Sequence, residues 1–163
     1  MEQLIRSARR RGIVVAYAPH HRFEPGSHSQ RRFLHPSHIR PLGLTVFREG
    51  SFGGQFYEAT APQDGDPVAS QHSCSSGFAG TDLHALLQAR GITHVVVIGM
   101  ITNSCIEATA RSAVDLDYHV TLVPDAVGAF SSEEHAETIE ERYPLIGHAM
   151  VSAKELAQAW GQG

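Results

Sequence analysis

A cysteine stands at a turn where nucleophilic chemistry is expected. Cys105 lies in the segment GMITNSCIEATAR (99–111), directly after a Val/Ile-rich run and in the first turn of an expected helix. A thiol there meets the positive end of the helix and backbone N–H groups, which favour the thiolate. The same N–H groups suit the oxyanion that develops during acyl transfer. The spacing therefore predicts a nucleophile at Cys105, with a small inert cysteine as the alternative.

A histidine begins the second segment of interest, QHSCSSGFAGTDL (71–83). His72 follows an expected strand, so it should face the same edge of a parallel sheet as Cys105. Cys74 is interpreted as a bystander thiol. A zinc site built from Cys74, Cys105 and His72 is the alternative, but no CxxC spacing supports it. We therefore expect no metal and no other cofactor.

Three further patterns are weaker signals of chemistry. The PHHR segment (19–22) places two adjacent histidines after an expected strand, and neighbours in an extended segment point opposite ways, so at most one would serve a given site. The arginines of RSARRR (6–11) are most simply the solvated face of a helix. The FGG sequence (52–54) lacks the preceding strand and following helix that a phosphate-binding loop requires.

Alternating strands and helices must position these residues. Such alternation predicts right-handed crossovers and a mostly parallel sheet covered on both faces. We expect a single three-layer α/β/α domain over residues 1–163, with Rossmann-like topology. The expected elements are helices over 2–11, 81–90, 103–117 and 131–142, strands over 13–18, 65–70, 94–100 and 118–124, a long irregular region over 19–66, and a last short strand and helix within HAMVSAKELAQAW (148–160). The Val/Ile-rich strand 94–100 is expected to be of the fully buried kind.

The composition limits the classes of partner. The chain has 163 residues, 42% of them hydrophobic, and a formal net charge of −4, which gives no electrostatic footprint for nucleic acid or anionic lipid. The longest apolar stretch, 95–101, is too short to span a bilayer, and no signal peptide opens the chain. We expect a cytoplasmic protein that acts on a small-molecule substrate and forms a homo-oligomer, with no nucleic-acid or membrane partner.

The same motifs resemble a known family. GMITNSCIEATARSAVDLDYHVTLVPDA (99–126) resembles the nucleophile segment of the isochorismatase-like cysteine hydrolases, in which a TN-x-C turn precedes E-x-TAR and a GY-x-V strand. SSGFAGTDLHALLQARGI (75–92) is similar to that family's preceding block, and YAPHHRFEPG (17–26) resembles a loop of one branch. The similarity covers about residues 10–155.

The resemblance implies hydrolysis of a small amide or related C–N bond through a cysteine thiolate and an acyl-enzyme. It assigns the nucleophile to Cys105 and the oxyanion hole to the backbone N–H groups of Ile101 and Cys105. A cis peptide bond is then expected between Met100 and Ile101. The family's lysine falls on His72, which carries a positive charge only partly near neutral pH.

The family's aspartate has no counterpart in this sequence. In the family it ends a strand that precedes the first helix, and this sequence begins within that helix. We therefore expect a domain short of its first strand, with a gap or unpaired backbone beside the neighbouring strands. Either the sequence lacks its natural N-terminus, or another chain or a rearrangement fills the gap. Asp82 and Asp125 are poor replacements from their positions. The alternative to an active amidohydrolase is thus a catalytically impaired binding or scaffold domain. A metal-assisted nicotinamidase needs an Asp-x-His-x-His cluster, and APHHR (18–22) lacks the aspartate.

Overall fold

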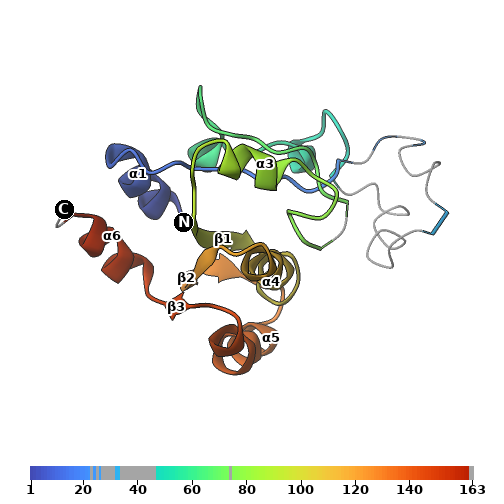
Figure 1. Cartoon of the computed structure of the whole chain (residues 1–163). Coiled ribbons are helices and arrows are strands. Elements are labelled where there is room, and N and C mark those ends of the chain that lie inside the picture. The colour runs from blue at the N-terminus through green and yellow to red at the C-terminus, as the bar shows by residue number, and fades with distance from the viewer. Residues whose placement is uncertain (23, 25, 27–31, 34–46, 74, 162–163) are drawn as a thin grey trace.

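Three parallel strands form the centre of the molecule. The computed structural model describes residues 1–22, 24, 26, 32–33, 47–73 and 75–161 (Figure 1). The strands β1 (His94–Met100), β2 (His119–Gly128) and β3 (Ala149–Met150) lie in the order β1-β2-β3. The predicted α/β class with a mostly parallel sheet is confirmed.

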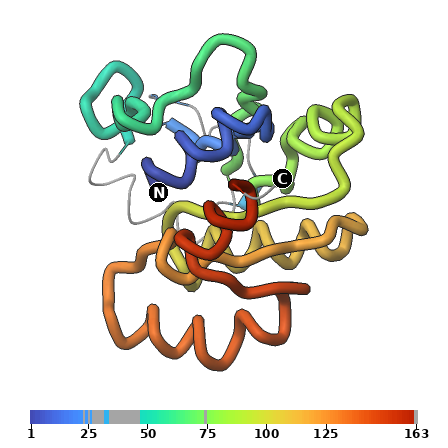
Figure 2. Tube along the Cα trace, turned by 90° about the vertical axis from the view of Figure 1, so that its left-hand side faces the viewer, coloured from blue at the N-terminus to red at the C-terminus, as the bar shows by residue number. Residues whose placement is uncertain are grey.

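Helices cover both faces of this sheet. Val120 and Leu122 of β2 are fully buried in a core shared with α3 (Leu83–Gln88) and α4 (Glu107–Asp115). Val123, which points to the opposite face, packs in a second core with α1 (Glu2–Arg10) and α6 (Ala153–Gly161). Figure 2 shows α1 and α6 close together on that side. The alternation of side chains along β2 thus produces the predicted three layers.

Two predicted helices contain π-helical turns. The helix expected over 103–117 begins with a wide turn at Thr102–Ile106 and continues as α4. The helix expected over 131–142 forms α5 (Ser132–Glu137) followed by a wide turn at Thr138–Arg142 and a 3₁₀ turn at Tyr143–Leu145. Two short 3₁₀ turns, Phe52–Gly54 and Glu58–Thr60, lie in the described part of the region expected to be irregular. None of the helices in the part of the chain that the structure describes is long and apolar enough to cross a membrane.

Two expected strands are not strands in the structure. Segment 13–18 is extended but forms one isolated β-bridge, in which Tyr17 pairs with Val68 of segment 65–70. Tyr17 N–H donates to Pro67 O over 2.9 Å, and Ala69 N–H donates to Tyr17 O over 2.8 Å. The prediction of strands was wrong because both segments have β-type sequence but find too few backbone partners to extend a ladder.

The predicted full burial of β1 was also wrong. The strand has the predicted bounds, but none of its residues is buried, and Val96 is 37% exposed. The cause is its place in the sheet, because β1 is the end strand among the described residues and pairs there with β2 alone.

One arginine of the first helix is not solvated. The Arg9 side chain is 18% exposed and pairs with Asp66, Nη2 to Oδ2, over 2.5 Å. It also donates to the Tyr17 hydroxyl over 2.9 Å and to Ala61 O over 3.2 Å. The expectation of a solvated arginine face is therefore wrong for Arg9, whose bonds hold α1 against the segment that contains Ala61 and Asp66.

Candidate active site

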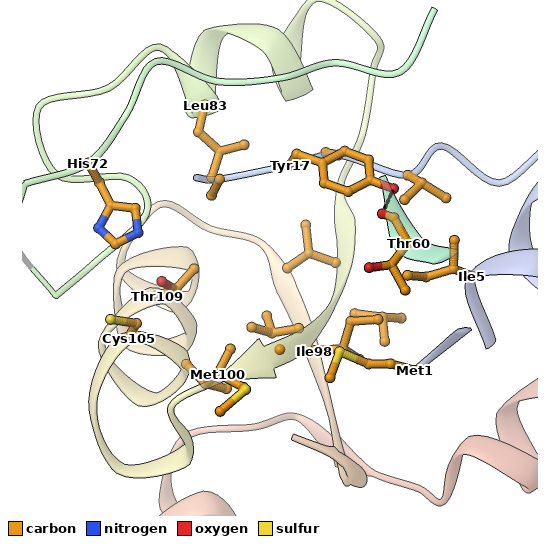
Figure 3. Close-up of a pocket in the computed structure, with 18 of the residues that line it drawn as sticks. Met1, Ile5, Tyr17, Thr60, His72, Leu83, Ile98, Met100, Cys105 and Thr109 are labelled. Atoms are coloured by element: carbon orange, nitrogen blue, oxygen red, sulfur yellow. Dashed lines mark hydrogen bonds between the residues drawn. The ribbon is translucent and has the colours of Figure 1, made fainter. Parts of the chain in front are cut away.

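Cys105 lies in the π-helical turn that joins β1 to α4. The N–H groups of Ser104 and Ile106 both donate to Ile101 O, over 3.1 and 3.2 Å, and close this turn. The cysteine is partly exposed and lines a cavity of about 350 Å³ that His72 also lines. Figure 3 shows the two side chains at the same end of the cavity, where β1 ends. The structure thus brings together the two residues that were selected from separate sequence motifs.

Buried residues hold the backbone that precedes Cys105 in place. The Met100–Ile101 peptide bond is cis, as the resemblance implies. Thr102 is fully buried, its carbonyl accepts the Tyr143 hydroxyl over 3.2 Å, and its Oγ1 lies 2.9 Å from His135 Nδ1. Burial raises the pKa of the Tyr143 phenol above its ordinary value, with the nearby Glu107 adding to the effect. Tyr143 was not singled out from the sequence, because its contact with Thr102 joins residues far apart in the chain.

His72 is held by backbone bonds on both sides. It is 4% exposed, its N–H donates to Pro19 O over 3.0 Å, and its carbonyl accepts His21 N–H over 2.8 Å. The His20 ring meets the His72 ring edge to face, with centroids 5.2 Å apart. The ring of His20, one of the two adjacent histidines in PHHR, therefore contacts the candidate site.

The two motifs that flank the cavity are joined by short polar side chains. Ser76 Oγ donates to Ser112 Oγ over 2.8 Å, and Gly77 N–H donates to Thr109 Oγ1 over 2.9 Å. A Cβ on Gly77 would lie 2.8 Å from the Ala18 Cβ. The backbone at residue 77 can therefore come this close to Ala18 because glycine has no side chain. Thr109 belongs to the E-x-TAR motif, but the sequence did not predict its role in holding the two motifs together.

Three carboxylates, two of them considered above as replacements for the family's aspartate, have structural partners. Asp82 Oδ1 accepts the Ser70 N–H over 2.7 Å, and this bond lowers the pKa of the Asp82 carboxyl. Asp125 Oδ1 accepts Ala153 N–H over 2.8 Å at the start of α6. Glu107 pairs with Arg111 and lies 3.6 Å from Arg142. Among the described residues that line the cavity with Cys105, none is Asp or Glu.

The described side chains also bear on the zinc alternative. Within residues 1–22, 24, 26, 32–33, 47–73 and 75–161, no group of three or more His, Cys, Asp or Glu side chains is placed to hold a metal ion. Cys74, which the zinc alternative requires, lies outside the described residues.

Comparisons with known proteins find one matching family model and several similar proteins. The model of the isochorismatase domain family matches residues 1–154. An uncharacterised isochorismatase family protein of Bacillus subtilis, YwoC, is 36% identical over 64% of this chain and 54% of its own. The ureidoacrylate amidohydrolase RutB of Klebsiella pneumoniae is 32% identical over 70% of this chain and 52% of its own. The chain thus spans about half the length of these two curated relatives.

Another relative, from Arabidopsis thaliana, is named a probable inactive nicotinamidase and is 29% identical over 84% of this chain and 69% of its own.

Two solved structures have the same fold. An isochorismatase family protein from Desulfovibrio vulgaris superposes with a TM-score of 0.80 at 26% identity, covering 98% of this chain and 82% of that one. The N-carbamoylsarcosine amidase of Thermoplasma acidophilum gives 0.69 at 28% identity, covering 93% and 79%.

Proposed function

The chain belongs to the isochorismatase family, and on that premise we propose that it is a cysteine hydrolase of small amides or related C–N bonds, with Cys105 as its nucleophile. The observation that carries the proposal is the shared cavity end of Cys105 and His72. The relatives named for amidase activity, ureidoacrylate amidohydrolase and N-carbamoylsarcosine amidase, support this class of substrate.

In the proposed reaction the Cys105 thiolate attacks the carbonyl carbon of the substrate. The backbone N–H groups of Ile101 and Cys105 stabilise the oxyanion of the tetrahedral intermediate. His72 stabilises the thiolate, or in its protonated form donates a proton to the departing nitrogen, so that the C–N bond breaks and an acyl-enzyme remains. Water then adds to the thioester carbonyl, the C–S bond breaks, and the acid and the free thiol are released.

A catalytically impaired scaffold is the second candidate. One specific observation favours it: no carboxylate belongs to the cavity lining among the residues that the structure describes, so no Asp or Glu side chain there can act as the general base. The relative named a probable inactive nicotinamidase supports this candidate. On this reading the same cavity binds a ligand and no bond is cleaved.

The reactivity of Cys105 separates the two candidates. The rate of alkylation by iodoacetamide is measured at pH 6 in a Cys74→Ala background, with N-acetylcysteine as the model thiol and Cys74→Ala/Cys105→Ala as the blank. A hydrolase should alkylate at least 10-fold faster than the model thiol, because only the thiolate reacts. Alkylation at the rate of the model thiol would favour the scaffold.

Turnover gives the second readout. Ammonia release from ureidoacrylate and from an N-carbamoyl amino acid is followed with the full chain and with Cys105→Ala. The proposal requires that any turnover disappears in Cys105→Ala. Turnover that survives in this variant would contradict the role of Cys105.

A further inference from the structure

Two polar groups of Thr102 are bonded to side chains from one later segment of the chain. Thr102 is fully buried and begins the π-helical turn that carries Cys105. Its carbonyl accepts the Tyr143 hydroxyl over 3.2 Å, and its Oγ1 lies 2.9 Å from His135 Nδ1. A hydroxyl buried to this degree needs a partner within the protein, and His135 supplies it.

The winding of the chain between His135 and Tyr143 brings these two side chains to one face. Residues seven apart share a face of an α-helix, and these two are eight positions apart in the sequence. The wide turn at Thr138–Arg142 lies between them and absorbs the extra residue, because a π-helical turn holds more residues than an α-helical one. His135 and Tyr143 therefore both reach Thr102.

The π-helical turn that carries Cys105 is thus held from outside as well as from within. Inside it, the N–H groups of Ser104 and Ile106 both donate to Ile101 O. Such turns are rare, occur mostly as single turns inside α-helices, and are frequent at functional sites. Since α4 continues directly from this turn, the turn would be free to rewind to α-helical geometry if Thr102 were released. Rewinding would move the Cys105 thiol.

We propose that His135 is a positioning residue for Cys105. Its bond to Thr102 Oγ1, together with the bond of Tyr143 to Thr102 O, keeps the turn in its wide form and so sets the position of the thiol at the end of the cavity. His135 belongs to α5, which packs against this turn, and it is not part of the cavity lining. It acts on the thiol through Thr102 and not through the substrate.

The first readout rests on the proposed function, in which Cys105 is a reactive thiolate. The rate of its alkylation by iodoacetamide is measured at pH 6 in full-length protein with the Cys74→Ala substitution, the parent protein. His135→Leu removes the bond to Thr102 and should slow alkylation at least 10-fold. His135→Asn keeps a polar atom at the position of Nδ1 and should remain within about 3-fold of the parent.

Thr102→Val is the second variant, because it removes the same bond and keeps the shape of the buried side chain. It should slow alkylation as much as His135→Leu, and the double variant should be no slower than either, since both changes remove one interaction. His84→Leu is the matched control. His84 Nδ1 lies 2.9 Å from the Tyr118 hydroxyl, a bond of the same kind in α3, and its loss should leave alkylation unchanged.

Circular dichroism checks the fold of each variant, and Thr102→Val decides the question if His135→Leu does not fold. Alkylation of His135→Leu at the rate of a reactive parent would overturn the proposal. A His135→Asn protein as slow as His135→Leu, or additive losses in the double variant, would overturn it as well, because the bond between His135 and Thr102 would then not be what matters.

Amide exchange separates a failure of this proposal from a failure of the proposed function. If the parent protein alkylates only at the rate of N-acetylcysteine, the hydrolase proposal fails, and hydrogen exchange of the Ser104 and Ile106 amides still tests His135. These amides should exchange at least 10-fold faster in His135→Leu and at the parent rate in His84→Leu. Unchanged exchange in His135→Leu would overturn the proposal.

Discussion

The backbone N–H of Gly77 donates a 2.9 Å hydrogen bond to Thr109 Oγ1, and this bond joins the segment that carries His72 to the helix that follows Cys105. The Ser76–Ser112 bond lies beside it. Together they set the separation of the two walls of the candidate site. The relative position of Cys105 and His72 therefore depends on residues other than these two.

Replacing Thr109 with valine should destabilise the fold. Valine has the same shape but cannot accept the Gly77 N–H, which would remain partly buried without a partner, at a cost of about 1–3 kcal/mol. Thr109→Ser keeps the hydroxyl and should cost less than Thr109→Val. Urea unfolding measures both, and a serine variant as unstable as the valine variant would show that the methyl group and not the hydrogen bond matters.

A side chain at residue 77 should be poorly tolerated. In Gly77→Ala the new Cβ would lie 2.8 Å from the Ala18 Cβ, so the backbone must move apart, with an expected loss of about 1–3 kcal/mol. Ala18→Gly removes the opposing carbon and should recover part of this loss in the double variant. Thermal unfolding of the single and double variants measures the coupling. Strict additivity would mean that the clash lies elsewhere.

The Tyr143 hydroxyl should make stability depend on alkaline pH. Its pKa is raised in the folded protein by burial, so its contribution is complete below pH 10, where the unfolded tyrosine is still neutral, and is lost as the pH rises further. Tyr143→Phe removes this dependence, and near neutral pH it should cost about 1 kcal/mol through loss of the bond to Thr102 O.

The measurement is the difference in unfolding free energy between wild type and Tyr143→Phe from pH 7 to 11. Tyr17 and Tyr118 also have raised pKa values because they are buried, but both are present in the two proteins and cancel in the difference. The difference should shrink above pH 10. A constant difference across this range would contradict the assignment.

Regular elements and the site position were predictable from local sequence. Helix α1 and strand β1 were predicted nearly to the residue, because apolar periodicity and a Val/Ile run are local signals. Cys105 was selected because it follows β1, and His72 because it follows an extended segment, and the structure places both at one cavity. Parallel topology makes such turns converge, so the spacing carried the information.

Tertiary contacts accounted for the errors. The burial of β1 and the pairing of 13–18 depend on what lies beside them, which no local pattern encodes. The Arg9–Asp66 pair was missed for the same reason, since a run of arginines on a helix is usually solvated. The π-helical turn at Thr102–Ile106 depends on the carbonyl of Ile101 accepting two N–H groups and on Tyr143 beneath it.

Removing the carboxylate of Asp66 should lower the free energy of unfolding more than removing an exposed carboxylate of α1. Asp66→Ala leaves the Arg9 guanidinium, whose Nε already has no partner among the described residues, without its charged neighbour. Breaking a largely buried pair in this way should cost about 2–4 kcal/mol. Glu2→Ala, which breaks the exposed Glu2–Arg6 pair, is the matched control and should cost about 0.5 kcal/mol.

Arg9→Met completes the test, because it removes the charge and keeps most of the apolar stem. The double variant Arg9→Met/Asp66→Ala should be more stable than the sum of the single losses predicts, since neither charge is then left unpaired. Chemical denaturation of all four proteins measures the coupling. If Asp66→Ala costs no more than Glu2→Ala, the Arg9–Asp66 pair does not hold α1 in place, and the position of α1 must depend on other contacts, such as its apolar packing against β2 and α6.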